Sequence, residues 1–264
     1  MDQIVLLIVV GGIAGVLSGM FGIGGGAIIV PSLIIFLGFS QIEANGTSLA
    51  ALLLPVGILA VLEYHRANKL KIWPALGVGL GLASGTWFGA VIALDLPADI
   101  LRQAYGIFLI YMAWRYIAPR KWLRELRGGQ TEQVAEDTEI DARSSRVIGI
   151  AFAIGAVAGI FSGLFGIGGG VVIVPALMLF LQFDQKLATG TSLGALLGPV
   201  GLPGVVAYYQ ADALDFATAA PLAIMLLIGA IVGARLALGL PTKTVRRLYG
   251  FFLLFVGLRF VLNL

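Results

Sequence analysis

Cysteine is absent from the 264 residues, histidine occurs once, and charged residues make up only 12% of the chain. The lack of cysteine excludes disulfides, thiolate metal sites and cysteine nucleophiles. Ordinary soluble domains contain about 25% charged residues, and a chain this poor in charge could not cover its surface with polar groups. With 59% hydrophobic residues, the composition predicts a membrane protein.

Long hydrophobic runs take the place of charge. They favour helices, because a membrane barrel shows short alternating segments. A helix needs about 20 residues to cross the bilayer core, so the chain can supply several crossings. The first residues, Met1-Asp2-Gln3, lack the basic region of a cleaved signal peptide, so we expect the first hydrophobic segment to be retained. The net charge of +3 indicates membrane orientation and predicts no nucleic-acid partner.

The two halves of the chain repeat one another. The segment GVLSGMFGIGGG at 15–26 returns as GIFSGLFGIGGG at 159–170, an offset of 144 residues. The same offset relates residues 46–49 to 190–193, both Gly-Thr-Ser-Leu, and needs no gap anywhere. Chance cannot produce this agreement, so the halves are a duplication. We predict a first membrane repeat at 1–118, a charged cytoplasmic linker at 119–146 and a second membrane repeat at 147–264.

Each repeat contains four hydrophobic blocks, near 4–39, 46–62, 72–94 and 102–118 in the first and 147–183, 190–208, 217–239 and 246–263 in the second. The first block is too long for one crossing, and its glycine cluster favours unwinding. That block is predicted to form either two helices that meet at a turn or a re-entrant hairpin.

Loop charges indicate the orientation of the repeats. The loop 63–71 is basic where its equivalent 207–215 is acidic, and the loop 95–101 is acidic where 239–247 is basic. By the positive-inside rule, one repeat is inverted relative to the other. The predicted fold is an all-α polytopic membrane protein with two inverted-topology repeats, glycine-broken or re-entrant helices and about 8–10 membrane segments.

Anion binding is the chemistry that the repeated motifs favour. The contiguous glycines place free N–H groups at the start of a helix, where the helix dipole attracts an anion. Close helix packing through small residues is the alternative, and it accounts for the glycines spaced four apart. Hydroxyls in the Gly-Thr-Ser motifs, at the expected start of an apolar helix, could donate to an oxyanion or cap the helix, and both can hold. The predicted substrate-binding residues are Gly24, Gly25, Gly26, Thr47, Ser48, Gly168, Gly169, Gly170, Thr191 and Ser192, with Ser18 and Ser162 as weaker candidates.

Other chemistry finds little support. No carboxylate pair, Ser/His/Asp set or phosphate loop with lysine is present, so we predict neither an enzyme nor a cofactor. The single histidine, His65, has Tyr209 as its repeat equivalent, so no metal site is expected, although His65 is a candidate for proton coupling. Arg235 is a candidate partner for an anion, and Glu63 and Arg66 lie where side chains near a helix end snorkel to the interface.

The doubled Gly-x-x-Ser-Gly-x-x-Gly-x-Gly-Gly-Gly-x-x-x-x-Pro element, followed in each half by Gly-Thr-Ser, resembles the TauE/SafE family of sulfite and organosulfonate exporters, within the toluene sulfonate uptake permease superfamily. The resemblance covers nearly the whole chain. It implies an inner-membrane secondary transporter, an exporter, of a small anion such as sulfite or sulfoacetate, with a coupling proton or cation and membrane lipid as further partners. A channel-like conduit is the alternative, and whether the chain forms a homodimer stays open.

Overall fold

The computed structural model describes residues 3–55, 57–117, 142–239 and 242–262, and within these ranges every regular element is a helix. The first half contains α1 (Gln3–Phe21), α2 (Gly26–Leu37), α3 (Gln41–Ala51), α4 (Ile58–Arg66), α5 (Ile72–Asp95) and α6 (Ala98–Ile117). The second contains α8 (Ser145–Phe165), α9 (Gly170–Phe180), α10 (Gln185–Ala195), α11 (Leu202–Gln210), α12 (Phe216–Gly239) and α13 (Thr242–Val261). The all-helical prediction is confirmed. Most of the predicted linker 119–146 lies outside the described residues.

The duplication extends to the helices. α3, α4, α5 and α6 each begin and end 144 residues before α10, α11, α12 and α13. The glycine cluster separates α1 from α2 and α8 from α9, so the first block of each repeat forms two helices that meet at a glycine turn. The hydrophobic block 46–62 contains the end of α3 and the start of α4. α3 begins at Gln41, before the block, and ends at Ala51, before Pro55, which cannot donate a helical hydrogen bond.

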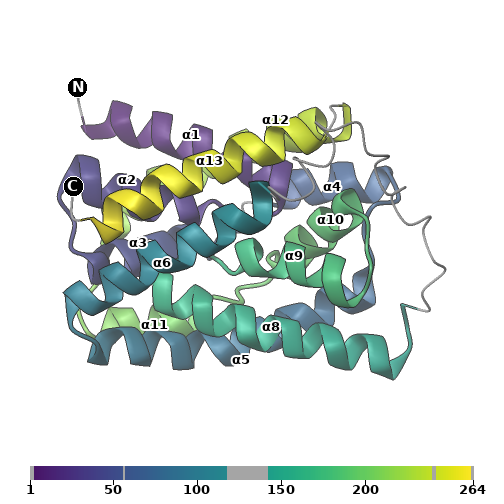
Figure 1. Ribbon diagram of the computed structural model, residues 1–264, viewed down its shortest axis with the longest axis horizontal. Coiled ribbons are helices and arrows are strands. Elements are labelled where there is room, and N and C mark those ends of the chain that lie inside the picture. Colours follow the sequence, from purple (N-terminus) through teal and green to yellow (C-terminus); the bar gives the residue numbers. More distant parts are fainter. Residues whose placement is uncertain (1–2, 56, 118–141, 240–241, 263–264) are drawn as a thin grey trace.

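The long helices interlock the two halves. α1 packs along α12, and α8 packs along α5 at the lower edge of Figure 1. Gly11 lies against Leu222 and Gly19 against Ala230, so α1 and α12 run parallel. A Cβ atom on Gly19 would lie 2.1 Å from the carbonyl oxygen of Ala230, which no side chain could tolerate. This close approach confirms helix packing as the role of the glycines spaced four apart.

The last helices of the two repeats pair with each other. Gly106 of α6 lies against Gly257 of α13, and Ile117 lies against Gly250, so the two helices run antiparallel. Figure 1 shows them side by side across the front of the molecule. α6 and its repeat equivalent α13 therefore point in opposite directions.

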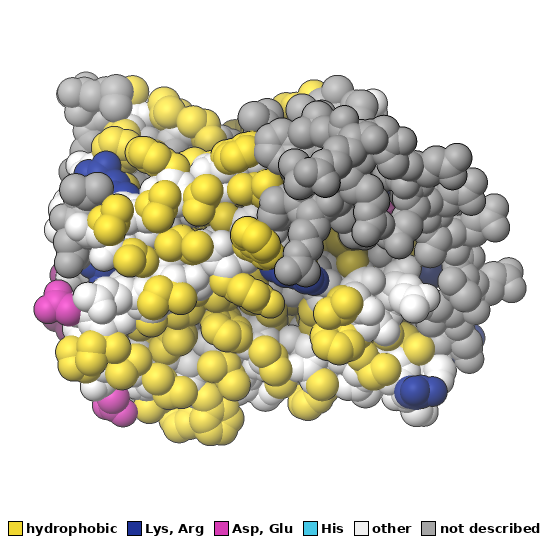
Figure 2. All heavy atoms as spheres, in the orientation of Figure 1, with side chains coloured by type: hydrophobic (Ala, Val, Ile, Leu, Met, Phe, Trp, Pro, Cys, Tyr) yellow, Lys and Arg dark blue, Asp and Glu magenta, His cyan; other side chains and the backbone are white. Residues whose placement is uncertain are grey.

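The surface is apolar over much of its area. α1, α5, α8 and α12 are long and apolar enough to cross a membrane. Large hydrophobic side chains project outward from several helices, among them Ile4, Leu80 and Phe255, which are 66–67% exposed. Figure 2 shows such side chains spread across the visible face. Soluble proteins rarely expose so much contiguous apolar surface to water, so this surface suits the interior of a bilayer.

Candidate functional site

Two loops of glycine lie between the halves, residues 22–25 and residues 166–169, here called the glycine loops. Three glycines in each have φ in the left-handed region, where other residues are strained. They are Gly22 (69°), Gly24 (80°), Gly25 (86°), Gly166 (67°), Gly168 (75°) and Gly169 (77°). The repeated motif is thus required by backbone conformation.

The glycine loops touch each other. A Cβ atom on Gly26 would lie 2.3 Å from the carbonyl oxygen of Gly166, and one on Gly170 would lie 2.1 Å from that of Gly22. At the centre, a Cβ on Gly24 would lie 3.6 Å from the Cα of Gly168. The structure therefore brings the six predicted glycines into one buried place, with backbone packed directly on backbone.

Side chains satisfy carbonyl groups around the ends of α1 and α8, where helical partners run out. At α1, Tyr64 donates to Gly19 (3.0 Å), Thr189 to Phe21 (3.4 Å) and Ser192 to Gly22 (2.8 Å). At α8, Tyr208 donates to Gly163 (2.7 Å), Asn45 to Leu164 (2.9 Å) and Ser48 to Gly166 (2.8 Å). At each end, two of the three donors come from the other repeat.

The amides on the other side of the glycine loops have no such partners. The first bond donated within α2 comes from Ile28, and the first within α9 comes from Val172. Among the described residues, nothing accepts from the backbone N–H groups of residues 24–27 or 168–171, all of which are buried. Both groups lie at the positive end of a helix dipole. The carbonyls of Gly22 and Gly166 have donors and these amides have no acceptor, which favours an anion near the amides.

The predicted hydroxyls divide into two kinds. Ser48 and Ser192 donate their protons to the glycine loops, so these protons are already used. Thr47 instead accepts from the backbone N–H of Asp215 at 2.9 Å, and Thr191 accepts from that of Lys71 at 3.2 Å. The two threonines contact the starts of α12 and α5, away from the loops. In the described part of the chain, nothing accepts their hydroxyl protons, although both residues are fully buried.

The expectation that these hydroxyls stand at the start of a helix is wrong. Thr47 lies inside α3, whose N-cap is Ser40, and Thr191 lies inside α10, whose N-cap is Asp184. Ser40 forms a capping box with Glu43, and this local hydrogen bonding starts α3 several residues before the hydrophobic run. The N-cap alternative for Thr47 and Ser48 is wrong for the same reason.

Sequence reasoning missed the roles of Asn45, Tyr64 and Tyr208. Tyr64 and Tyr208 match across the repeat, and tyrosines in a membrane interior need a partner for their hydroxyls. That pair of facts could have marked them as carbonyl donors. Asn45 lies where the second repeat has Thr189, and its side-chain oxygen also accepts a hydrogen bond from the Gln41 side-chain amide at 2.9 Å. Ser18 and Ser162 are buried in the last turns of α1 and α8.

Charges lie away from the glycine loops. Among the described residues, no buried side chain is charged. Arg235, a candidate partner for an anion, donates instead to Glu63 at 3.1 Å. His65 is exposed at the end of α4. In the described ranges, no group of acidic, histidine or cysteine residues could hold a metal ion.

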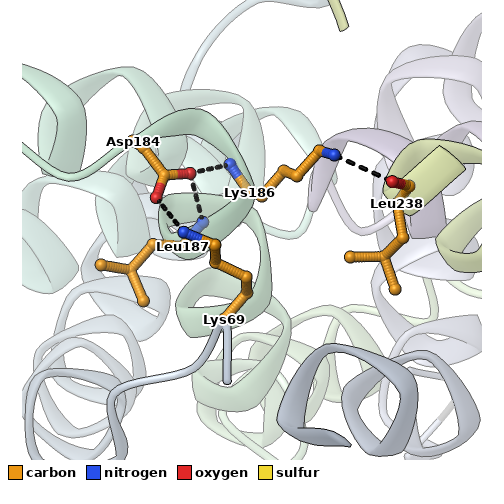
Figure 3. Close-up of polar contacts among 5 residues, drawn as sticks. All are labelled: Lys69, Asp184, Lys186, Leu187 and Leu238. Atoms are coloured by element: carbon orange, nitrogen blue, oxygen red, sulfur yellow. Dashed lines mark hydrogen bonds and ion pairs between the residues drawn. The ribbon is translucent and has the colours of Figure 1, made fainter. Parts of the chain in front are cut away.

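A second polar cluster surrounds Asp184, the N-cap of α10 (Figure 3). Its carboxylate accepts from Lys69 at 2.7 Å and from the backbone N–H groups of Lys186 and Leu187. The Lys186 ammonium donates to the Leu238 carbonyl near the end of α12, at 2.9 Å. Burial alone would raise the pKa of Asp184, but the hydrogen bonds from Lys69 and the backbone outweigh it and hold this pKa below its usual value.

Interlocked apolar helices around paired glycine breaks define a multi-pass membrane protein of the transporter class. Residues 6–260 match the family described as Sulfite exporter TauE/SafE, and the chain belongs to that family of membrane transporters, which are not enzymes. The chain is 27% identical to the "Probable membrane transporter protein YunE" of Bacillus subtilis, with 97% of each chain covered. It is 28% identical to a probable membrane transporter protein of Methanocaldococcus jannaschii, with 90% of this chain and 86% of the relative covered. No solved structure matches it significantly.

Proposed function

We propose that this chain is a secondary transporter that exports a small sulfur-containing anion, such as sulfite, sulfoacetate or another organosulfonate. One observation carries the proposal. The buried amides of residues 24–27 and 168–171 have no acceptor among the described residues, while side chains of the opposite repeat donate to the carbonyls of Gly22 and Gly166. An unsatisfied N–H group in a membrane interior costs several kcal/mol. An oxyanion that reaches these helix starts would satisfy several amides at once.

The lack of buried charge supports a weakly held anion. No lysine or arginine is buried among the described residues, so amides and hydroxyls supply the attraction. A sulfonate or sulfite group presents several oxygens, which suits two sets of amides contributed by the two repeats. The proposed site comprises Gly24–Gly26 and Gly168–Gly170. Ser48 and Ser192 position the loops, and Thr47 and Thr191, whose hydroxyls contact the starts of α12 and α5, would offer the anion further hydroxyl protons outside the loops.

Inverted repeats complete the proposal. The antiparallel pairing of α6 with its equivalent α13 supports inversion, and so does the exchange of basic and acidic loops between the repeats. An odd number of crossings in each repeat is then required. Counting α3 and α4 as one broken crossing gives five per repeat and places the start of α1 and the end of α13 on the same side, as in Figure 1. The basic loops would face the cytoplasm across the inner membrane.

A flux assay tests the function. Proteoliposomes that contain the purified protein are loaded in turn with labelled sulfite, sulfoacetate and taurine. Efflux from them is compared with efflux from protein-free vesicles. We expect saturable efflux and counterflow of at least one of them. A folded preparation that moves none of the three would refute the substrate class. Ohmic conductance without saturation or counterflow would favour a channel instead.

A further inference from the structure

The two ends of the helical bundle, here called the basic face and the acidic face, contain equivalent loops that make different contacts. The basic face contains the end of α4, the start of α10 and the end of α12. The acidic face contains the equivalent end of α11, start of α3 and end of α5. α12 has 24 residues and runs from one face to the other, a length of about 36 Å. Figure 1 places α4 and α10 on the right and α3 and α11 on the left.

Ion pairs join the two repeats at the basic face. Lys69 of the first repeat lies 2.7 Å from Asp184 of the second, with side chains only 29% and 15% exposed. Glu63 of α4 lies 3.1 Å from Arg235 of α12. Lys69–Asp184 bridges the repeats where α4 ends and α10 begins, as Figure 3 shows, and Glu63–Arg235 bridges them between α4 and α12. The low exposure of Lys69 and Asp184 strengthens their pair, since less water screens it, whereas the Arg235 side chain is 65% exposed and its pair with Glu63 is screened more.

The acidic face has no counterpart to these pairs. The equivalents of Lys69 and Asp184 are Ala213 and Ser40, and those of Glu63 and Arg235 are Ala207 and Val91, none of which carries charge. The crevice between the same two loops is open there. It forms a pocket of about 250 Å³ lined by Gly38, Phe39, Glu43, Asp212, Leu214 and Asp215.

Equivalent side chains are also more buried at the basic face than at the acidic face. Glu43 is exposed at the pocket, while its equivalent at the basic face, Leu187, is only 7% exposed. We propose that Lys69–Asp184 and Glu63–Arg235 form an ion-pair gate that closes the crevice between the repeats at the basic face. The described conformation is closed there and open at the acidic face. The gate rests on the proposed transport function, because an anion must pass this face, and the pairs break when it does.

Single-cysteine labelling tests the gate directly, because the chain has no cysteine of its own. Leu187→Cys reports on the basic-face crevice, and Leu214→Cys reports on the acidic-face pocket. Each is treated, in detergent and without substrate, with a membrane-impermeant thiol reagent. We expect slow labelling of Leu187→Cys. Adding Lys69→Gln should speed it about fivefold, the factor that a pair worth 1 kcal/mol contributes to a two-state equilibrium. Glu63→Gln should act in the same direction.

Two controls separate gating from loosening of the fold. Lys69→Arg keeps the charge and should keep labelling slow, and Leu214→Cys should label at the same rate with or without Lys69→Gln. Unchanged labelling of Leu187→Cys in both neutral variants would overturn the gate, and so would an equal rise at both cysteines. The assay needs no transported substrate, so a negative flux result with a positive labelling result would refute the substrate class alone.

Discussion

The hydroxyl of Ser48 donates to the carbonyl oxygen of Gly166 at 2.8 Å, and 144 residues later Ser192 donates to Gly22 at the same distance. Each bond runs from one repeat to the glycine loop of the other. The binding site proposed here therefore cannot form in one repeat alone, and a shift of α3 or α10 moves the opposite loop. Each serine stabilises the glycine loop of the other repeat, so both repeats need it. These two hydrogen bonds are here called the cross-ties.

Replacing Ser48 with alanine should destabilise the protein. The Gly166 carbonyl would lose its donor in a buried place, which costs about 1–3 kcal/mol. Thermal unfolding in detergent should show a lower melting temperature, and Ser192→Ala should give a loss of similar size because its geometry is equivalent. Ser84→Ala is the matched control, since Ser84 is exposed and bonds only to Gly81 of its own helix. Equal melting temperatures for the Ser48 and Ser84 variants would contradict the cross-tie.

Alanine at Gly26 should be more damaging. Its Cβ would meet the Gly166 carbonyl oxygen at 2.3 Å, so the two loops would have to separate. Overpacking of this kind costs about 1–3 kcal/mol or more. Gly12→Ala provides the control because nothing lies within 4 Å of a Cβ there, and removing a helical glycine should be neutral or stabilising. The expression level and the melting temperature of the Gly26→Ala and Gly12→Ala proteins are measured and compared. A Gly26→Ala protein as stable as Gly12→Ala would show that the loops do not pack as described.

The sequence predicts some of these features and not others, for physical reasons. The glycine break could be foreseen at Gly22–Gly26, because a cluster of glycine disfavours helix wherever it occurs. The start of α3 could not be read from hydrophobicity, since Ser40 and Glu43 set it through hydrogen bonds within a polar segment. The pairing of α1 with α12 could not be predicted from the sequence of either helix. Spaced glycines indicate that a helix packs closely, but they do not indicate which helix it packs against.

Tyr64 and Tyr208 should matter equally. Each donates to a carbonyl in the last turn of α1 or α8, at Gly19 and Gly163. Phenylalanine at either position keeps the packing and removes the donor, so we expect similar destabilisation, about 1–3 kcal/mol each. Tyr111→Phe should leave the melting temperature unchanged, because Tyr111 is 58% exposed. Strongly unequal effects of the two variants would argue against equivalent roles in the repeats.

Thr47 and Thr191 provide the sharpest test of the binding site. Both hydroxyls accept a backbone N–H bond, from Asp215 and Lys71, while their own protons have no acceptor among the described residues. The double variant Thr47→Val with Thr191→Val should lose about 0.5–1.5 kcal/mol per hydrogen bond in stability. If the free protons contact the anion, transport should fall further than stability does, with a raised KM for flux. Thr47→Ser with Thr191→Ser keeps both hydroxyls and should restore the KM. Unchanged transport in the valine variant would remove these hydroxyls from the site and leave the amides of the glycine loops as its anion ligands.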